Sequence, residues 1–136
     1  MSWGIFSKDS LFSLLNVMGI LMFSTIVVTS VNGEPIQFLQ TNDVYKLHKG
    51  FWVVNYHLAG YKYSDKGAKL FTKASKDKKY EKVNFASFNC LDNIDYCFAK
   101  GISKFPSITL EQNGRIKSKL QGAPRAVEQI KQFIQK

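Results

Sequence analysis

A proline at the start of a short apolar run constrains the fold of this chain more than any other feature. Pro106 directly precedes Ser107–Gln112, whose length and composition are those of a buried strand. Proline has no backbone N–H to donate to a sheet, so it belongs at the first residue of a strand or at a sheet edge. X-Pro bonds are also the only peptide bonds that adopt the cis form at modest cost. We therefore expect Pro106 to mark a tight turn into a buried strand.

Strands and helices are predicted to alternate along residues 34–136. The expected strands cover residues 34–39, 51–56, 83–88, 107–112 and 115–120. The expected helices cover residues 41–49, a segment capped by Ser64 or Asp65, residues 92–100 and residues 124–134. Asn113-Gly114 is a strong hairpin signal between the last two strands. This order predicts an α/β domain with a central mixed sheet and helices on both faces.

The segment around Pro106 also resembles a known family. Gly101-Ile102-Ser103-Lys104-Phe105-Pro106-Ser107-Ile108-Thr109-Leu110 is similar to the Gly-Val-x-x-Tyr-Pro-Thr-Leu segment of thioredoxin-fold domains, especially those of the protein disulfide isomerase group. The order of strands and helices across residues 34–136 matches that fold, and Lys119–Ala123 resembles its final strand and closing glycine. The resemblance implies a thioredoxin fold in which Pro106 is the cis-proline beside the active-site loop. A proline that merely opens an ordinary strand is the alternative.

The loop that carries the redox cysteines of this family has none here. The family's second strand runs into Phe-Tyr-Ala-Pro-Trp-Cys-Gly-His-Cys-Lys, and this chain, aligned on Tyr56, reads Asn55-Tyr56-His57-Leu58-Ala59-Gly60-Tyr61-Lys62-Tyr63-Ser64. Gly60 and Tyr63 hold the two cysteine positions, with Tyr61 and Lys62 between them. Thiol–disulfide exchange needs a reactive thiolate and a resolving thiol. We therefore expect no catalytic residue and no cofactor in Gly60–Tyr63, which we call the vestigial redox loop.

Cys90 and Cys97 are the only cysteines of the chain. Several secretory disulfide isomerase domains are similar here, with a cysteine after the third strand and another seven residues on. The resemblance implies a structural disulfide, with two reduced cysteines or an exchange-active pair as alternatives. A metal site is not expected, because the two cysteines and the distant His48 and His57 lack the spacing of a four-ligand site.

The cis-proline loop and the redox loop form the part of this fold that family members use to hold extended peptide. The candidate peptide-binding residues are Tyr56, Leu58, Tyr61, Tyr63, Phe105 and Pro106. Aromatic and apolar groups with a rim of Lys62 and Lys104 suit non-covalent recognition of an unfolded or acidic polypeptide. The alternative is that the tyrosines only fill the space left by the cysteines. His57 lies beside the loop, but no nucleophile accompanies it as a general base would require.

The first 33 residues form a separate segment. Leu11–Val28 contains no charged residue and is near the length of roughly 20 residues that crosses a bilayer. Val31 and Gly33 fit the spacing that signal peptidase reads, with cleavage before Glu34. Residues 1–33 are thus predicted to be a cleaved signal peptide or a retained signal anchor, with a buried core helix as a third reading. The first two place the thioredoxin-like domain, residues 34–136, in the endoplasmic reticulum lumen or the secretory pathway.

The charge of the chain limits its partners. The formal net charge is +9, which favours acidic partners or anionic lipid head groups. No nucleic-acid-binding signature accompanies the basic residues, so a solvated basic surface is the better interpretation. The leading hypothesis is a redox-inactive, disulfide isomerase-like protein that binds client or partner polypeptides non-covalently. The alternative is a membrane-anchored accessory or scaffold subunit of a larger complex, and an enzyme acting through Cys90 and Cys97 comes third.

Overall fold

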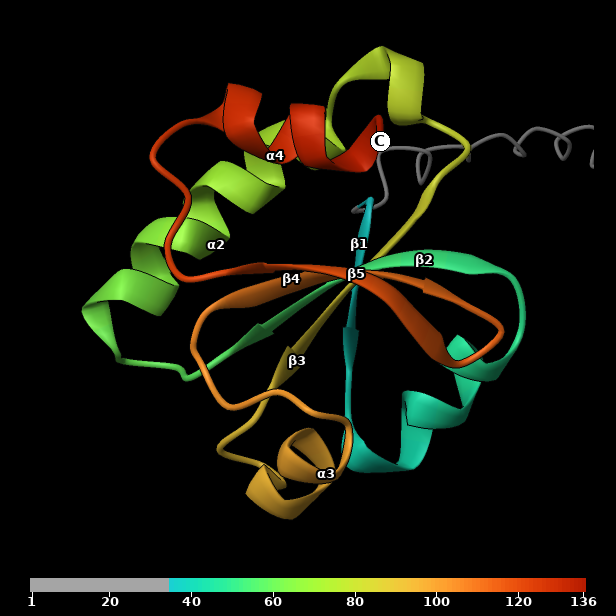
Figure 1. The fold of residues 1–136 in the computed structure, drawn as a ribbon, viewed down its shortest axis with the longest axis vertical. Coiled ribbons are helices and arrows are strands. Elements are labelled where there is room, and N and C mark those ends of the chain that lie inside the picture. The colour runs from blue at the N-terminus through green and yellow to red at the C-terminus, as the bar shows by residue number, and fades with distance from the viewer. Residues whose placement is uncertain (1–34) are drawn as a thin grey trace, which may run out of the picture. The chain divides into compact units, whose positions relative to one another are not determined.

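A computed structural model describes residues 35–136, which form one compact unit (Figure 1). The predicted N-terminal hydrophobic helix and the predicted cleavage site before Glu34 lie outside the described residues. Among the helices within residues 35–136, none is long and apolar enough to cross a membrane.

The described chain follows the predicted order of strands and helices, with one short 3-10 helix added before the third strand. The elements are β1 (Ile36–Leu39), the 3-10 helix η2 (Thr41–His48), β2 (Phe51–His57), α2 (Lys62–Ser75), the short 3-10 helix η3 (Lys78–Tyr80), β3 (Asn84–Asn89), α3 (Ile94–Ala99), β4 (Ser107–Gln112), β5 (Arg115–Gln121) and α4 (Val127–Ile134). The predicted α/β class is thereby confirmed, although the segment after β1 is a 3-10 helix throughout.

The five strands form one mixed sheet in the order β1-β3-β2-β4-β5. The strands β1, β3 and β2 run parallel, and β4 pairs antiparallel with both β2 and β5. The hairpin between β4 and β5 turns at Asn113 and Gly114, whose φ angles are 50° and 85°. Positive φ at both central residues defines the hairpin turn that the Asn-Gly pair predicts.

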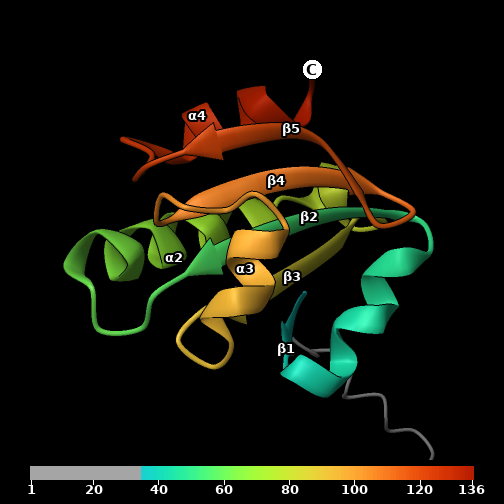
Figure 2. The ribbon, with the colours of Figure 1, turned by 60° about the horizontal axis from the view of Figure 1, so that its bottom comes forward.

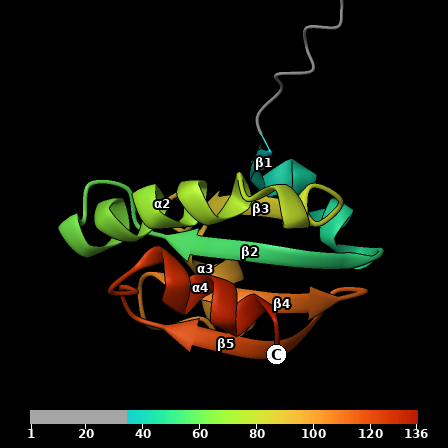
Figure 3. The same ribbon diagram turned by 90° about the horizontal axis from the view of Figure 1, so that it is seen from above.

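Helices cover both faces of the sheet and enclose two apolar cores. The helices α2 and α4 lie side by side on one face (Figures 1 and 3), over a core that includes Phe71, Phe85 and Ile130. The opposite face carries α3 and η2 (Figure 2), over a core that includes Phe88 and Leu47. The segments after β2 and before β4 meet at one end of the sheet, since Tyr56 of β2 pairs with Ser107 of β4.

The helix α2 begins earlier than predicted. Its first residue is Lys62, and the preceding Tyr61 makes no side-chain capping bond. Ser64 Oγ instead accepts a hydrogen bond from the backbone N–H of Leu58 at 3.1 Å, and Asp65 Oδ1 accepts one from Gly60 at 3.3 Å. The prediction that Ser64 or Asp65 caps α2 is therefore wrong. These side chains stabilise the loop before the helix instead of the helix's own N–H groups.

Candidate functional site

Pro106 is fixed between α2 and the end of β5. The Phe105–Pro106 peptide bond is cis, the configuration that the family resemblance implied. The Pro106 carbonyl accepts a hydrogen bond from the backbone N–H of Gly122 at 2.8 Å. On its other side, a Cβ added to Gly67 of α2 would lie 3.0 Å from Pro106 Cγ. Real Cβ contacts essentially never fall below this distance, so glycine at position 67 lets the helix approach the proline closely.

The vestigial redox loop presents two aromatic rings at the start of α2. The backbone N–H of Tyr61 donates to the Leu58 carbonyl at 3.1 Å, and Gly60 takes a φ of 87°, a conformation that favours glycine. Tyr61 and Tyr63 are 44% and 47% exposed, and their rings meet edge to face with centroids 5.4 Å apart. The Lys62 ammonium lies 5.2 Å from the Tyr63 ring centroid. The loop is therefore ordered and exposes aromatic surface beside a cation.

An open groove of about 430 Å³ lies between this loop and the segment that leads to Pro106. We call it the cis-proline groove. Its lining residues are Leu58, Tyr61, Ser103, Lys104, Phe105 and Gly122. The structure thus brings three of the predicted binding residues together, namely Leu58, Tyr61 and Phe105, with Lys104 beside them. Ser103 and Gly122 were not predicted, although Gly122 was recognised as the closing glycine after the last strand.

The other predicted binding residues lie outside the groove lining. Tyr56 is fully buried, so the assignment of Tyr56 to a peptide-binding surface is wrong. Its ring points to the α3 side of the sheet, where it packs edge to face with Phe88 at a centroid distance of 6.4 Å. Pro106 is buried next to Phe105 in the chain, and Tyr63 is exposed and packs on Tyr61. Neither residue lines the groove.

The Tyr56 hydroxyl belongs to a buried polar cluster that sequence reasoning missed. It donates to Glu111 Oε2 at 2.7 Å, and Thr109 Oγ1 lies 2.7 Å from the same oxygen. Lys100 Nζ lies 2.6 Å from Glu111 Oε1. Burial, and next the negative charge of Glu111, raise the pKa of Tyr56 far above its usual range, so the phenol stays protonated as a donor. Both oxygens of the Glu111 carboxylate therefore have polar partners.

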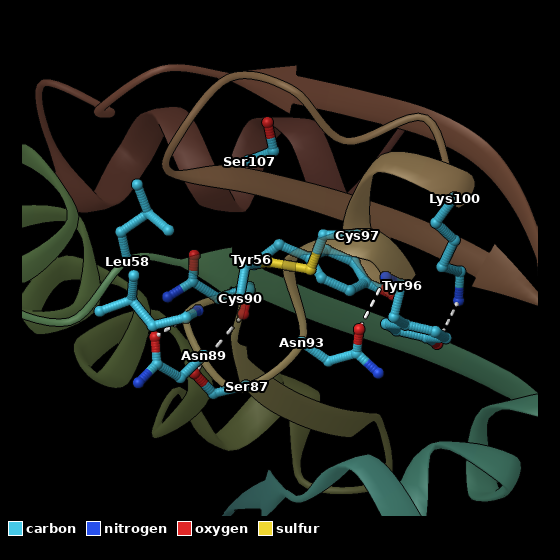
Figure 4. Close-up of a disulfide and its surroundings, with 12 residues drawn as sticks. Tyr56, Leu58, Ser87, Asn89, Cys90, Asn93, Tyr96, Cys97, Lys100 and Ser107 are labelled. Carbon is cyan, nitrogen blue, oxygen red and sulfur yellow. Dashed lines mark hydrogen bonds between the residues drawn. A yellow bond between two sulfur atoms is a disulfide. The ribbon is translucent and has the colours of Figure 1, made fainter.

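The structure joins Cys90 and Cys97 in a disulfide with a Cα–Cα distance of 6.0 Å (Figure 4). Both cysteines are fully buried, and Figure 4 shows Tyr56 and Tyr96 close to the bond. The Cys90 backbone N–H donates to the His57 carbonyl at 2.8 Å, and the Cys97 carbonyl accepts from Ile102 at 2.9 Å. The disulfide therefore connects the end of β3 to α3 inside the core.

His57 ends β2 and is only partly buried. Desolvation lowers the pKa of His57, and the negative charges of Asp65 and Asp92 offset part of this effect. No hydrogen bond connects its side chain to a nucleophile among the described residues. Within residues 35–136 there is also no group of three or more histidine, cysteine, aspartate or glutamate side chains that could hold a metal ion.

The sheet order and a cis-proline next to the loop after β2 are those of a thioredoxin-fold domain. A model of the thioredoxin family matches residues 67–136, just over half of the chain. The chain belongs to the thioredoxin family. The match begins after Gly60–Tyr63, so the vestigial redox loop is not part of the matched segment.

Solved structures agree with this assignment. A thioredoxin of Malassezia sympodialis, Mala s 13, is similar in fold with a TM-score of 0.65 and 16% identity, over 74% of this chain and 88% of that chain. Human ERp44 is similar with a TM-score of 0.62 and 26% identity, over 74% of this chain but only 28% of the ERp44 chain. The J-Trx1 fragment of ERdj5 gives a TM-score of 0.62 and 18% identity, over 76% and 50% of the two chains. ERp44 and ERdj5 are of the protein disulfide isomerase family. No curated protein matches the sequence.

Proposed function

We propose that this protein is a redox-inactive member of the thioredoxin family that holds a polypeptide segment non-covalently in the cis-proline groove. One observation carries the proposal: the groove is lined by Leu58, Tyr61 and Phe105 at the place where the redox loop has lost both cysteines. An open apolar groove with a few polar groups is the usual form of a binding site. In this chain the groove offers contact surface in place of a nucleophile.

The absence of redox activity is supported by the positions of the two cysteines. Exchange begins with the attack of an accessible thiolate on a disulfide. Cys90 and Cys97 are joined to each other and are fully buried, and Gly60 and Tyr63 stand where the family has its reactive pair. We therefore infer that the disulfide has a structural role in this protein.

The lining of the groove indicates the kind of polypeptide that it would take. Tyr61 and Phe105 can pack against apolar or aromatic side chains, and aromatic residues are enriched in binding surfaces. Lys104 lines the groove, and Lys62 lies in the adjacent loop. The ammonium groups of both lysines attract carboxylates. The ligand class is thus an extended polypeptide with apolar and acidic residues.

We place this function in the secretory pathway. A buried disulfide is typical of oxidising compartments, and the structural neighbours include proteins of the disulfide isomerase family. Whether residues 1–33 are a signal peptide or an anchor decides between a soluble binding protein and a scaffold subunit of a membrane complex. The intact mass of the native protein tests this: a chain that starts at Glu34 removes the anchored scaffold, and a chain that keeps Leu11–Val28 supports it.

The binding proposal is tested with an unfolded polypeptide whose cysteines have all been alkylated, so that no covalent complex can form. The probe is reduced, carboxymethylated α-lactalbumin, which is unfolded and acidic, and its binding to the full chain is followed by fluorescence anisotropy. We expect saturable binding that Tyr61→Ser weakens about tenfold. Tyr45→Ser, which removes an exposed tyrosine on η2, serves as the matched control and should leave binding unchanged. Equal effects of both variants would overturn the groove assignment.

The redox part of the proposal has its own test. The full chain should not accelerate the reduction of insulin by dithiothreitol above the background rate, whereas an active thioredoxin should. Acceleration that is lost on changing Cys90→Ala or Cys97→Ala would make the protein an oxidoreductase and would overturn this part.

A further inference from the structure

The outer side of α3 is apolar where a surface helix is normally polar. Leu91, Ile94 and Phe98 are 62%, 37% and 55% exposed. Their spacing of three and four residues places them in one row along the helix and the turn before it. Figure 2 shows α3 at the front of the sheet, on the face opposite to α2 and α4. We call this row and its neighbours the α3 face.

The α3 face also carries negative charge on a basic protein. Asp92 and Asp95 lie between the three apolar residues in the sequence and are exposed. Neither carboxylate makes an ion pair or a side-chain hydrogen bond with another residue of the part that the structure describes. The chain as a whole carries a net charge of +9, but between Asn89 and Ala99 it contains these two carboxylates and no lysine or arginine.

Three sets of contacts fix the backbone of α3, which carries this face. The disulfide links Cys97, in the middle of α3, to Cys90 at the end of β3. At the C-terminal end of the helix, the Lys100 ammonium reaches the buried carboxylate of Glu111 at 2.6 Å. At its N-terminal end, Asn93 Oδ1 accepts a hydrogen bond from the backbone N–H of Tyr96 at 3.0 Å (Figure 4). A surface fixed in this way loses little conformational entropy when a partner binds.

The α3 face is a different surface from the cis-proline groove, although the two are neighbours. Asn89 Oδ1 accepts hydrogen bonds from both Ala59 and Leu91, each at 3.2 Å, and so connects the loop after β2 to the start of the apolar row. The charge that accompanies the apolar groups differs between the two surfaces. Lys104 lines the groove, whereas Asp92 and Asp95 accompany the α3 face.

From these observations we propose that the α3 face is a second docking surface, which binds a partner polypeptide that presents apolar side chains flanked by lysine or arginine. The apolar row supplies the contact area, as exposed apolar patches do at interaction sites. The two carboxylates select a basic partner by charge complementarity. The disulfide and the Lys100–Glu111 pair keep the face in its binding conformation. The proposal stands independently of what the groove binds.

The test uses two fluorescein-labelled helical peptides of 18 residues with the same pattern of leucines. One carries lysine at all other positions, and the other carries glutamate. Binding to the full chain is measured by anisotropy at low and at high salt. We expect the leucine–lysine peptide to bind in spite of the protein's net positive charge. The double change Asp92→Lys and Asp95→Lys should weaken this binding at least tenfold, and Phe98→Ser or Leu91→Ser should weaken it several-fold.

The matched control is the double change Glu81→Lys and Glu128→Lys. It alters the net charge by the same amount at two exposed positions away from α3, and it should leave binding of the leucine–lysine peptide unchanged. Tyr61→Ser in the groove should also leave it unchanged, so a failure of the groove proposal and a failure of this one are distinguishable.

Three results would overturn the proposal. In the first result, the wild-type chain fails to bind the leucine–lysine peptide. In the second result, the double variant at Asp92 and Asp95 and the control double variant at Glu81 and Glu128 weaken binding equally, which would make net charge the only cause. In the third result, sedimentation shows that the wild-type chain self-associates and that the change at Asp92 and Asp95 abolishes this, which would assign the α3 face to a second copy of the chain.

Discussion

The ammonium of Lys100 lies 2.6 Å from a carboxylate oxygen of Glu111, a side chain that is fully buried in the sheet. Lys100 itself is 14% exposed at the end of α3, so the pair joins the helix to β4 through a largely desolvated ion pair. The same ammonium lies 5.6 Å from the ring centroids of both Tyr56 and Tyr96. A single lysine thereby connects α3, β2 and β4.

Removal of the lysine charge should therefore destabilise the fold strongly. We expect Lys100→Met to lower the free energy of unfolding by about 3–5 kcal/mol, because the Glu111 carboxylate remains buried without its counterion. The double change Lys100→Met and Glu111→Gln should lose less, because a neutral amide oxygen can still accept from Tyr56 and Thr109. Urea unfolding of the full chain, followed by near-ultraviolet circular dichroism, measures both values. A double variant less stable than Lys100→Met alone would contradict this role.

The Cys90–Cys97 disulfide should contribute a moderate amount to stability. It closes a short loop, with a sequence separation of seven residues, and loops of this size restrict the unfolded chain by about 2–3 kcal/mol. We expect the double change Cys90→Ala and Cys97→Ala to lower the unfolding free energy by about this amount. Reductant should destabilise the wild-type chain and leave the double variant unaffected. If the double variant is as stable as the wild-type chain, the disulfide does not stabilise the fold.

His57 should make stability depend on pH. Burial lowers the pKa of His57 in the folded chain below its ordinary value of about 6.5. As the pH falls below about 6.5, the unfolded chain therefore gains a proton that the folded chain does not yet bind, and the free energy of unfolding decreases until the folded-state pKa is reached. We expect a lower melting temperature at pH 5.5 than at pH 7.5.

The variant His57→Gln should reduce this difference in melting temperature, and His48→Gln, at an exposed position on η2, is the matched control. Thermal unfolding at the two pH values measures the effect. A difference that persists in full in the His57→Gln variant would assign the pH dependence to other groups.

Gly67 should be required for the geometry of the cis-proline groove. A methyl group at this position would meet Pro106 Cγ at 3.0 Å and Pro124 Cδ at 3.5 Å. The cost of overpacking, about 1–3 kcal/mol, should exceed the gain of about 1 kcal/mol from replacing a helical glycine by alanine. We expect Gly67→Ala to reduce stability, to shift the Phe105 and Tyr61 signals in NMR spectra and to weaken polypeptide binding. Lys66→Ala, one residue earlier and exposed, is the control, and equal stability of the two variants would contradict the packing argument.

The parts of the fold that the sequence predicted well depend on local signals. Pro106, with its restricted backbone, indicated the start of β4, and Asn113-Gly114 indicated the hairpin because both residues tolerate positive φ. The family resemblance led to the groove residues Leu58, Tyr61 and Phe105, since these follow directly from the alignment with the redox loop and the cis-proline segment.

The errors arose where distant parts of the chain decide the outcome. Tyr56 was assigned to the surface because of its place in the family motif, but β2 is central in the sheet and Tyr56 faces the core. Ser64 and Asp65 were assigned as helix caps, although the preceding loop offers them the N–H groups of Leu58 and Gly60. The Lys100–Glu111 pair could not be predicted, because its two residues come from different elements and meet only through the packing of α3 on the sheet.

The measurement that tests the central claim most directly is an NMR titration of the isotope-labelled full chain with carboxymethylated α-lactalbumin. If the protein binds polypeptide through its cis-proline groove, the largest shift changes should lie at Leu58, Tyr61, Ser103, Phe105 and Gly122. In the Tyr61→Ser variant they should require about tenfold more α-lactalbumin. Changes confined to the lysines of α2, such as Lys66, Lys69 and Lys73, and abolished by salt would mean that the probe binds only the basic surface. That result would contradict the proposed function.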